Sequence, residues 1–136
     1  MRYLVKEAQY EFNYVDFGEN DHSSLLVVAR EEGEEAARMQ VVAAHEIGYY
    51  KIEYFLIRDW QHRLILGHRF MQMFTEAVSE MGGEEVLIYP CAETYEGAGE
   101  VPVDQWYEFL ETLGFRFAKE GADRHKPCQE MKFMIE

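Results

Sequence analysis

The order of apolar and polar residues divides the first part of the chain into short segments typical of β-strands. Aromatic and charged residues mix over residues 3–17, a pattern that fits a strand or a short helix and that we interpret as a strand. The apolar run LLVVA at residues 25–29 predicts a buried strand. The charged, glycine-containing segment 31–35 predicts a turn, and residues 39–44 (MQVVAA) predict the second strand of a hairpin. The alternative is one helix over residues 34–47, because alanine and glutamate favour helix.

The centre of the chain carries a strand–helix–strand pattern. Residues 49–57 (YYKIEYFLI) are aromatic and β-branched and contain neither glycine nor proline, which predicts a strand. Apolar residues recur at steps of three and four over residues 66–81, which predicts an amphipathic helix that ends at Gly82 and Gly83. Residues 86–89 (VLIY) then predict a short buried strand. We expect a right-handed crossover with the two strands parallel.

The last part of the chain predicts a helix that ends abruptly and leads into a sheet. Residues 93–102 are polar and are expected to form an exposed loop, after which Asp104 is a plausible N-cap of a helix that ends at Gly114. Residues 115–117 predict a strand, and residues 131–135 (MKFMI) predict its antiparallel partner across the loop 119–129. The whole chain, residues 1–136, therefore predicts a single α/β domain.

Composition excludes some classes of partner. The chain has 136 residues, 26 acidic and 13 basic, and a formal net charge of -13, so we expect no direct binding to nucleic acid or to an anionic membrane surface. A cationic partner is favoured instead, or imitation of a polyanion. Cys91 and Cys128 are too few for a disulfide scaffold, and no signal peptide or transmembrane run is evident. These features predict a cytoplasmic protein with reduced cysteines.

Two stretches resemble the GNAT superfamily of acyl-CoA-dependent N-acetyltransferases. FLETLGFRF, residues 109–117, is similar to the end of a helix common in that family, and residues 51–73 are similar to its strand-plus-helix acetyl-CoA motif. The resemblance covers most of the chain from residue 25 onward and implies a GNAT-like twisted mixed sheet, with a βαβ crossover and helices packed on the sheet. Short chains of this kind are also similar to acetyltransferase-like proteins of bacteriophages.

The resemblance implies where acetyl-CoA, the acyl donor, would bind. In the family, acyl-CoA inserts between two splayed parallel strands, here residues 49–57 and 86–89, and Phe55 and Ile57 would lie along it. A loop of the pattern Q/R-x-x-G-x-G/A then wraps the pyrophosphate with backbone N–H groups. In this chain that loop is His62-Arg63-Leu64-Ile65-Leu66-Gly67, which keeps only the last glycine. The implied phosphate contacts are His62, Arg63, Gly67, His68 and Arg69.

A basic cluster supports an anion site independently of the family. Arg58, His62, Arg63, His68 and Arg69 fall within twelve residues at the start of the predicted helix. Cations at that end oppose the helix dipole, and a bound polyanion would explain them. The alternative is that they pair with carboxylates across an acidic surface.

Two residues are candidates for catalysis. Glu53 could act as the general base that deprotonates an amine, because period two places it on one face of its strand with Phe55 and Ile57, where partial burial would raise its pKa. The alternative is a solvent-facing carboxylate. Many family members have a tyrosine before the "ekLGF" sequence that protonates the departing thiolate, but Leu110 occupies that position here. Tyr107, one turn earlier, is the possible substitute or else an amphipathic rim residue.

The segment HKPC suggests a metal site only weakly. His125 and Cys128 have a compatible spacing and Asp123 is near, but a zinc site needs about four ligands and no second pair is evident. We predict an exposed loop without metal here, and a buried thiol at Cys91.

The sequence therefore leads to one function and one alternative. The first is acyl-CoA-dependent N-acetyltransfer by direct attack of an amine on the thioester, with a cationic small molecule or protein amine as acceptor. A second subunit could supply the acceptor wall that the short N-terminal part lacks. The alternative is a catalytically degenerate acidic binding or structural module of the same fold, such as a virion-associated protein or a nucleic-acid mimic.

Overall fold

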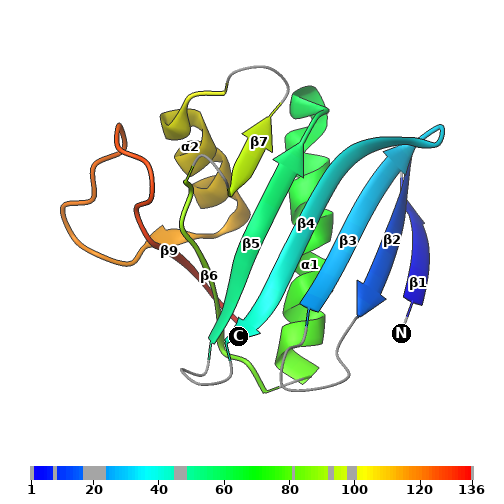
Figure 1. The fold of residues 1–136 in the computed structure, drawn as a ribbon, viewed down its shortest axis with the longest axis horizontal. Coiled ribbons are helices and arrows are strands. Elements are labelled where there is room, and N and C mark those ends of the chain that lie inside the picture. The colour runs from blue at the N-terminus through cyan, green and yellow to red at the C-terminus, as the bar shows by residue number, and fades with distance from the viewer. Residues whose placement is uncertain are drawn as a thin grey trace.

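The computed structural model describes residues 2–7, 9–16, 24–44, 49–80, 82–91, 94–97 and 101–135. Its elements are β1 (Arg2–Glu7), β2 (Tyr10–Asp16), β3 (Ser24–Glu31), β4 (Glu34–Ala44), β5 (Tyr49–Ile57), the 3₁₀ helix η1 (Trp60–His62), α1 (Arg63–Glu80), β6 (Glu85–Ile88), β7 (Tyr95–Gly97), α2 (Val103–Leu113), β8 (Arg116–Phe117) and β9 (Met131–Met134). The strands form one sheet in the order β1-β2-β3-β4-β5-β6-β9-β8, and β7 pairs with β5 (Figure 1). Within the residues described, no helix has the length and apolar character needed to cross a bilayer.

The first five strands pair antiparallel, each with the next. Residues 3–17 do not form one strand as predicted, because the chain reverses between Glu7 and Tyr10 and continues as β2. β3 and β4 are joined at Glu32 and Gly33, whose φ values of 51° and 84° are both positive, as a two-residue hairpin turn of the primed type requires. The predicted hairpin is confirmed, and the helical alternative is wrong.

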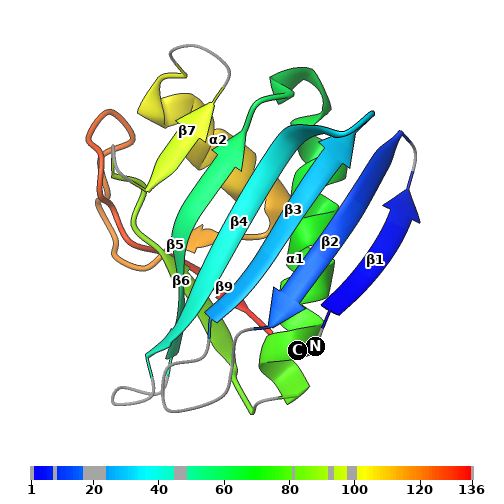
Figure 2. The same cartoon turned by 45° about the vertical axis from the view of Figure 1, so that its right-hand side comes forward.

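The predicted strand–helix–strand unit with parallel strands is confirmed. β5 covers the predicted residues, α1 begins at Arg63, three residues earlier than predicted, and β6 pairs parallel with β5 from Tyr50–Val86 to Ile52–Ile88. The amphipathic pattern explains the position of α1, because its apolar side chains are buried only when that side of the helix packs on the sheet. α1 lies across one face of the sheet, behind the strands in both views (Figures 1 and 2).

The core fills the space between that face and α1. Phe12, Met39 and Ile52 point from the sheet and Phe70 and Phe74 from α1, and all five are fully buried. Phe12 and Phe70 meet edge to face, with 5.8 Å between ring centroids. Because these residues alternate with more exposed ones along each strand, the helix-facing side of the sheet carries the main core.

The abrupt end of α2 is confirmed, but its start differs from the prediction. Pro102 occupies the cap position and Asp104 lies within the first turn, with no side-chain cap bond. At the other end, Gly114 adopts φ 115° and Phe115 N–H donates to Leu110 O at 3.0 Å, which is a Schellman arrangement. The chain then enters β8, which pairs antiparallel with β9, as predicted.

Candidate functional site

The expected donor site lies where β5 and β6 separate. β6 pairs with β5 only over Tyr50–Ile52, and the two strands diverge toward their C-terminal ends. There β7 pairs parallel with β5, Phe55 opposite Tyr95 and Ile57 opposite Gly97, and Phe55 N–H donates to Thr94 O at 2.8 Å (Figure 1). The prediction that residues 93–102 form only an exposed loop is wrong over Tyr95–Gly97. β7 therefore occupies the edge of β5 to which the resemblance assigns acyl-CoA.

Aromatic rings fill the space behind this edge. Trp106 of α2 lies at the centre, with ring centroids 4.9 Å from Tyr95, 5.1 Å from Trp60 and 5.6 Å from both Phe55 and Phe109. The indole Nε1 of Trp106 is buried and has no hydrogen-bond partner among the described residues. Phe55 and Ile57, predicted to line the cofactor, are fully buried core residues.

The predicted pyrophosphate loop is helical. η1 leads directly into α1 at Arg63, so the segment from His62 to Gly67 has no open loop. Gly67 lies in the second turn of α1, where a Cβ would come within 2.8 Å of Phe109 Cζ and 2.9 Å of the Leu113 methyl carbons. Its lack of a side chain lets α1 and α2 approach each other. The prediction that this segment wraps a pyrophosphate as a loop is therefore wrong in the arrangement described.

The basic cluster is partly neutralised by local partners. Arg58 reaches Glu35 at 3.9 Å, and His62 Nδ1 lies 2.9 Å from Asp59 Oδ2. The guanidinium of Arg63 stacks over the Trp60 ring at 4.9 Å and donates to Trp60 O at 2.9 Å. Of the last two cluster residues in sequence, Arg69 donates to the side chain of Gln72 at 2.9 Å and His68 is exposed. Carboxylates therefore pair with two of the five, Arg58 and His62.

A buried hydrogen-bonded group next to this cluster was not predicted. The hydroxyl of Tyr10, a fully buried side chain of β2, donates to Asp59 Oδ2, which also faces His62. Burial raises the pKa of Tyr10, and the hydrogen bond and charge of Asp59 raise it further. Burial would raise the pKa of Asp59, but the hydrogen bonds from Tyr10 and His62 outweigh it, so that pKa lies below its ordinary value. Tyr10 and Asp59 are 49 residues apart, so no local pattern could have linked them.

Glu53 occupies a β-bulge. Gln40 pairs with Tyr54 and Val41 with Ile52, so Glu53 is an extra residue on β5 and the period-two alternation breaks there. Its side chain is exposed, whereas Phe55 and Ile57 are buried. The predicted face shared by the three is therefore wrong, because the bulge turns Glu53 to the solvent side of the sheet.

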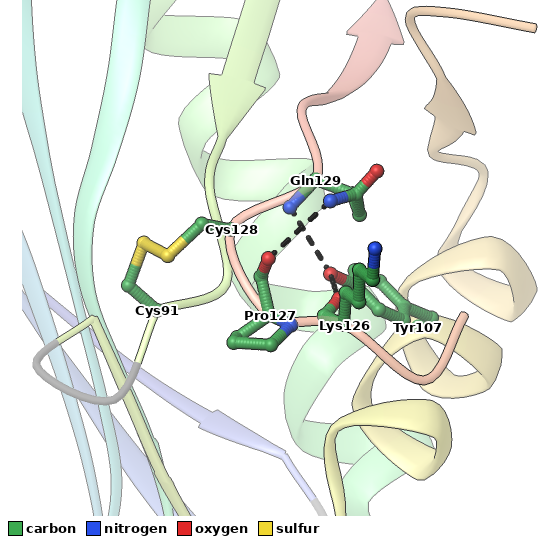
Figure 3. Close-up of a disulfide and its surroundings, with 6 residues drawn as sticks. All are labelled: Cys91, Tyr107, Lys126, Pro127, Cys128 and Gln129. Carbon is green, nitrogen blue, oxygen red and sulfur yellow. Dashed lines mark hydrogen bonds between the residues drawn. A yellow bond between two sulfur atoms is a disulfide. The ribbon is translucent and has the colours of Figure 1, made fainter. Parts of the chain in front are cut away.

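Tyr107 anchors the loop between β8 and β9. Its ring is fully buried, and its hydroxyl donates to Lys126 O at 2.5 Å and accepts from Gln129 N–H at 3.1 Å (Figure 3). Burial raises the pKa of Tyr107, and the hydrogen bond from Gln129 opposes that effect. The hydroxyl is thus engaged by backbone groups of the loop.

Cys91 and Cys128 form a disulfide (Figure 3). It links the segment between β6 and β7 to the loop that Tyr107 anchors, and Cys128 N–H also donates to Pro90 O at 3.0 Å. The predictions of reduced cysteines and of a buried thiol at Cys91 are wrong in this structure. His125 N–H donates to the Asp123 carboxylate at 2.9 Å in an exposed loop, and no group of described residues could hold a metal ion.

Acetyl-CoA does not fit this arrangement in the way the resemblance implies. The edge of β5 is paired with β7, and Trp106 and Tyr95 fill the space behind it. The backbone from His62 onward is helical, so it cannot wrap a pyrophosphate. The exposed His68 and the polar ends of the other basic side chains remain suited to phosphates, but a donor could reach β5 only after β7 leaves it.

Comparison with known proteins gives the fold. No family model and no curated sequence matches the chain. Among solved structures, nourseothricin acetyltransferase aligns with a TM-score of 0.60 at 15% identity over 99% of this chain and 88% of that one. A GNAT-family acetyltransferase from Staphylococcus aureus Mu50 gives 0.61 at 11% identity, covering 83% and 68%. An aminoglycoside 6'-N-acetyltransferase complexed with coenzyme A gives 0.60 at 14% identity, covering 83% and 73%.

These identities are low, but each of the three alignments spans most of both chains. The resemblance read from the two sequence stretches is confirmed at the level of architecture. The chain has the α/β fold of the GNAT acetyltransferases.

Proposed function

We propose that the chain is an acyl-CoA-dependent N-acetyltransferase that takes its donor after β7 has left the edge of β5. The observation that carries this proposal is the separation of β5 from β6. Beyond the point of separation, the edge of β5 pairs with β7, a strand of only three residues. Without β7, the backbone of Phe55–Ile57 would offer an unpaired edge to an extended ligand with amide groups. The basic side chains at the start of α1 would then lie near the phosphates of that ligand.

The acceptor proposed is a cationic amine, since the net charge of -13 favours positively charged partners. Glu53 is retained as the candidate general base, because the bulge makes its carboxylate accessible. Tyr107 can serve as a proton donor only if the 119–129 loop releases its hydroxyl. Acetyl-CoA is the proposed donor.

A second candidate is a non-catalytic acidic module of the same fold. The pairing of β7 with β5 favours it, as does the aromatic packing around Trp106. In this case β7 stays in place and the protein acts through its surface. The two candidates differ in whether the edge of β5 ever opens.

Calorimetric titration with acetyl-CoA distinguishes them. We would compare wild type with Glu96→Pro, which interrupts the short β7 ladder because proline lacks an N–H group. Arg63→Ala combined with Arg69→Ala removes two phosphate contacts, and Arg116→Ala combined with Arg124→Ala is the matched loss of charge elsewhere.

If the chain is an acetyltransferase, Glu96→Pro should bind acetyl-CoA more tightly than wild type does. Only the double substitution Arg63→Ala with Arg69→Ala should weaken acetyl-CoA binding. Absence of heat at millimolar ligand in both wild type and Glu96→Pro would rule it out and leave the non-catalytic module. Equal losses in the two arginine pairs would show a general charge effect and would also contradict the proposed site.

A further inference from the structure

A groove lies at the opposite end of α1 from the basic cluster. It has a volume of about 680 Å³ and is bounded by the last turns of α1, the end of α2 and β9. The α1 wall is polar and acidic, formed by Thr75, Glu76, Ser79 and Glu80. None of the described residues that line it belongs to β5, β7 or the basic cluster, so this groove is separate from the edge of β5.

The carboxylates of this wall lie where the helix itself disfavours them. Glu80 is the last residue of α1 and Glu76 lies one turn earlier, and the last turn carries no basic residue. Like charges four residues apart repel, and both face the negative end of the helix dipole. The ion pairs found among the described residues do not include either of them. A bound cation would relieve both effects.

The opposite wall is apolar and includes an exposed side chain. Leu113, Phe133, Met134 and Ile135 line it, and Met134 is 59% exposed, the largest value among the exposed large apolar side chains described. Exposed apolar surface beside carboxylates suits a ligand that has both an apolar and a cationic part.

The same wall also offers backbone groups. β8 pairs with β9 only at Lys132 and Met131, and Ile135 N–H donates to Glu84 O of the β6 side at 2.9 Å. Because N–H and C=O groups alternate in direction along a strand, those of Met134 point away from β6 and toward the groove. Among the described residues no strand pairs with Met134 on that side.

We propose that this groove binds an extended, basic peptide segment of a partner protein. The peptide backbone would pair with the free edge at Met134, as an added strand does. Alternate side chains would then point to opposite faces of the sheet, apolar ones beside the exposed Met134 and lysine or arginine on the other face, toward Glu76 and Glu80. An amine without a peptide backbone would use only the acidic wall. The proposal does not depend on acetyl transfer.

The test is a titration of isotope-labelled full-length protein, followed by NMR, with a blocked six-residue peptide of alternating valine and lysine. Shift changes are expected to concentrate at residues 75–80, 113–114 and 133–135. Two control peptides separate the walls: glutamate in place of lysine removes the charge match, and N-methylation of alternate amides removes the strand pairing. Both are expected to bind at least fivefold more weakly.

Matched protein variants test the carboxylates. Glu76→Gln with Glu80→Gln should weaken peptide binding roughly fivefold, the sum of two exposed ion pairs, without loss of fold by circular dichroism. Glu108→Gln with Glu120→Gln, two exposed carboxylates elsewhere, should leave the affinity unchanged.

Equal binding of the N-methylated peptide, or equal binding of spermine, would overturn the peptide assignment. Concentration-dependent shifts at the same residues without peptide would show that a second copy of the chain is the occupant, which would also overturn it. Shift changes confined to other residues would reject the groove as the site.

Discussion

Removal of the disulfide should destabilise the chain by an amount that its sequence separation sets. Cys91 and Cys128 are 37 residues apart, so the bond restricts a long loop of the unfolded chain. The loop-closure expression gives about 13 cal/mol/K, or about 4 kcal/mol at 25 °C. Cys128 has φ 64°, an unfavourable value for a residue with a side chain, and its relaxation in a cut chain would return roughly 1 kcal/mol. We therefore expect Cys91→Ala with Cys128→Ala to lose about 3 kcal/mol.

Urea unfolding followed by tryptophan fluorescence measures this loss, since Trp106 is fully buried and Trp60 packs against it. With a slope of about 2 kcal/mol/M, the midpoint should fall by about 1.5 M. Wild type in dithiothreitol should match the double variant, and the double variant should not respond to the reductant.

Two results would refute the reasoning. A loss below about 1 kcal/mol, with the bond verified, would mean that the unfolded chain already brings these segments together and that loop closure is not the main term. Two titratable thiols in the denatured, untreated protein would contradict the disulfide itself.

Three further predictions concern single side chains. Gly67→Ala should lower the unfolding temperature, because overpacking against Phe109 costs about 1–3 kcal/mol and exceeds the helix-propensity gain of about 1 kcal/mol; a raised temperature would show that the helices can move apart. Tyr107→Phe should lose about 1–2 kcal/mol in urea unfolding and speed amide exchange in residues 119–130, and unchanged exchange would contradict the anchoring role. The lowered pKa of Asp59 means that it adds stability above its ordinary value of 3.8, lost as the pH falls through the folded-state pKa; Asp59→Asn should flatten that part of the pH–stability curve, and an unchanged curve would contradict the hydrogen bonds from Tyr10 and His62 to this carboxylate.

The parts of the fold that could be predicted from the sequence depend on local signals. The period of apolar residues in α1 and the left-handed stop at Gly114 act within a few residues, and both were found. β7 was missed because its three residues carry little pattern, and their place depends on pairing with β5 across the sheet. The bulge at Glu53 is likewise a property of two strands together.

The candidate site was less predictable than the fold for the same reason. The basic residues near the start of α1 are close in sequence, so their clustering was visible. Their contacts with distant parts of the chain were not visible in the sequence. Arg58 meets Glu35 of β4, and Tyr10 of β2 binds the same carboxylate, Asp59, as His62. Cys91 and Cys128 precede and follow α2 in the sequence, and no local feature indicates that they form a disulfide.

The position of β9 within the sheet has a consequence for how the chain folds. β1 to β5 pair with their sequence neighbours, so that half of the sheet can assemble from hairpins with short loops. β9 instead lies between β6 and β8, and its pairs with β6 join residues more than forty positions apart. Because distant contacts form more slowly than near ones, we expect the meander to form early and the insertion of β9 to complete the sheet. On a ribosome, β6 and β8 could be joined in one sheet only after β9 has emerged.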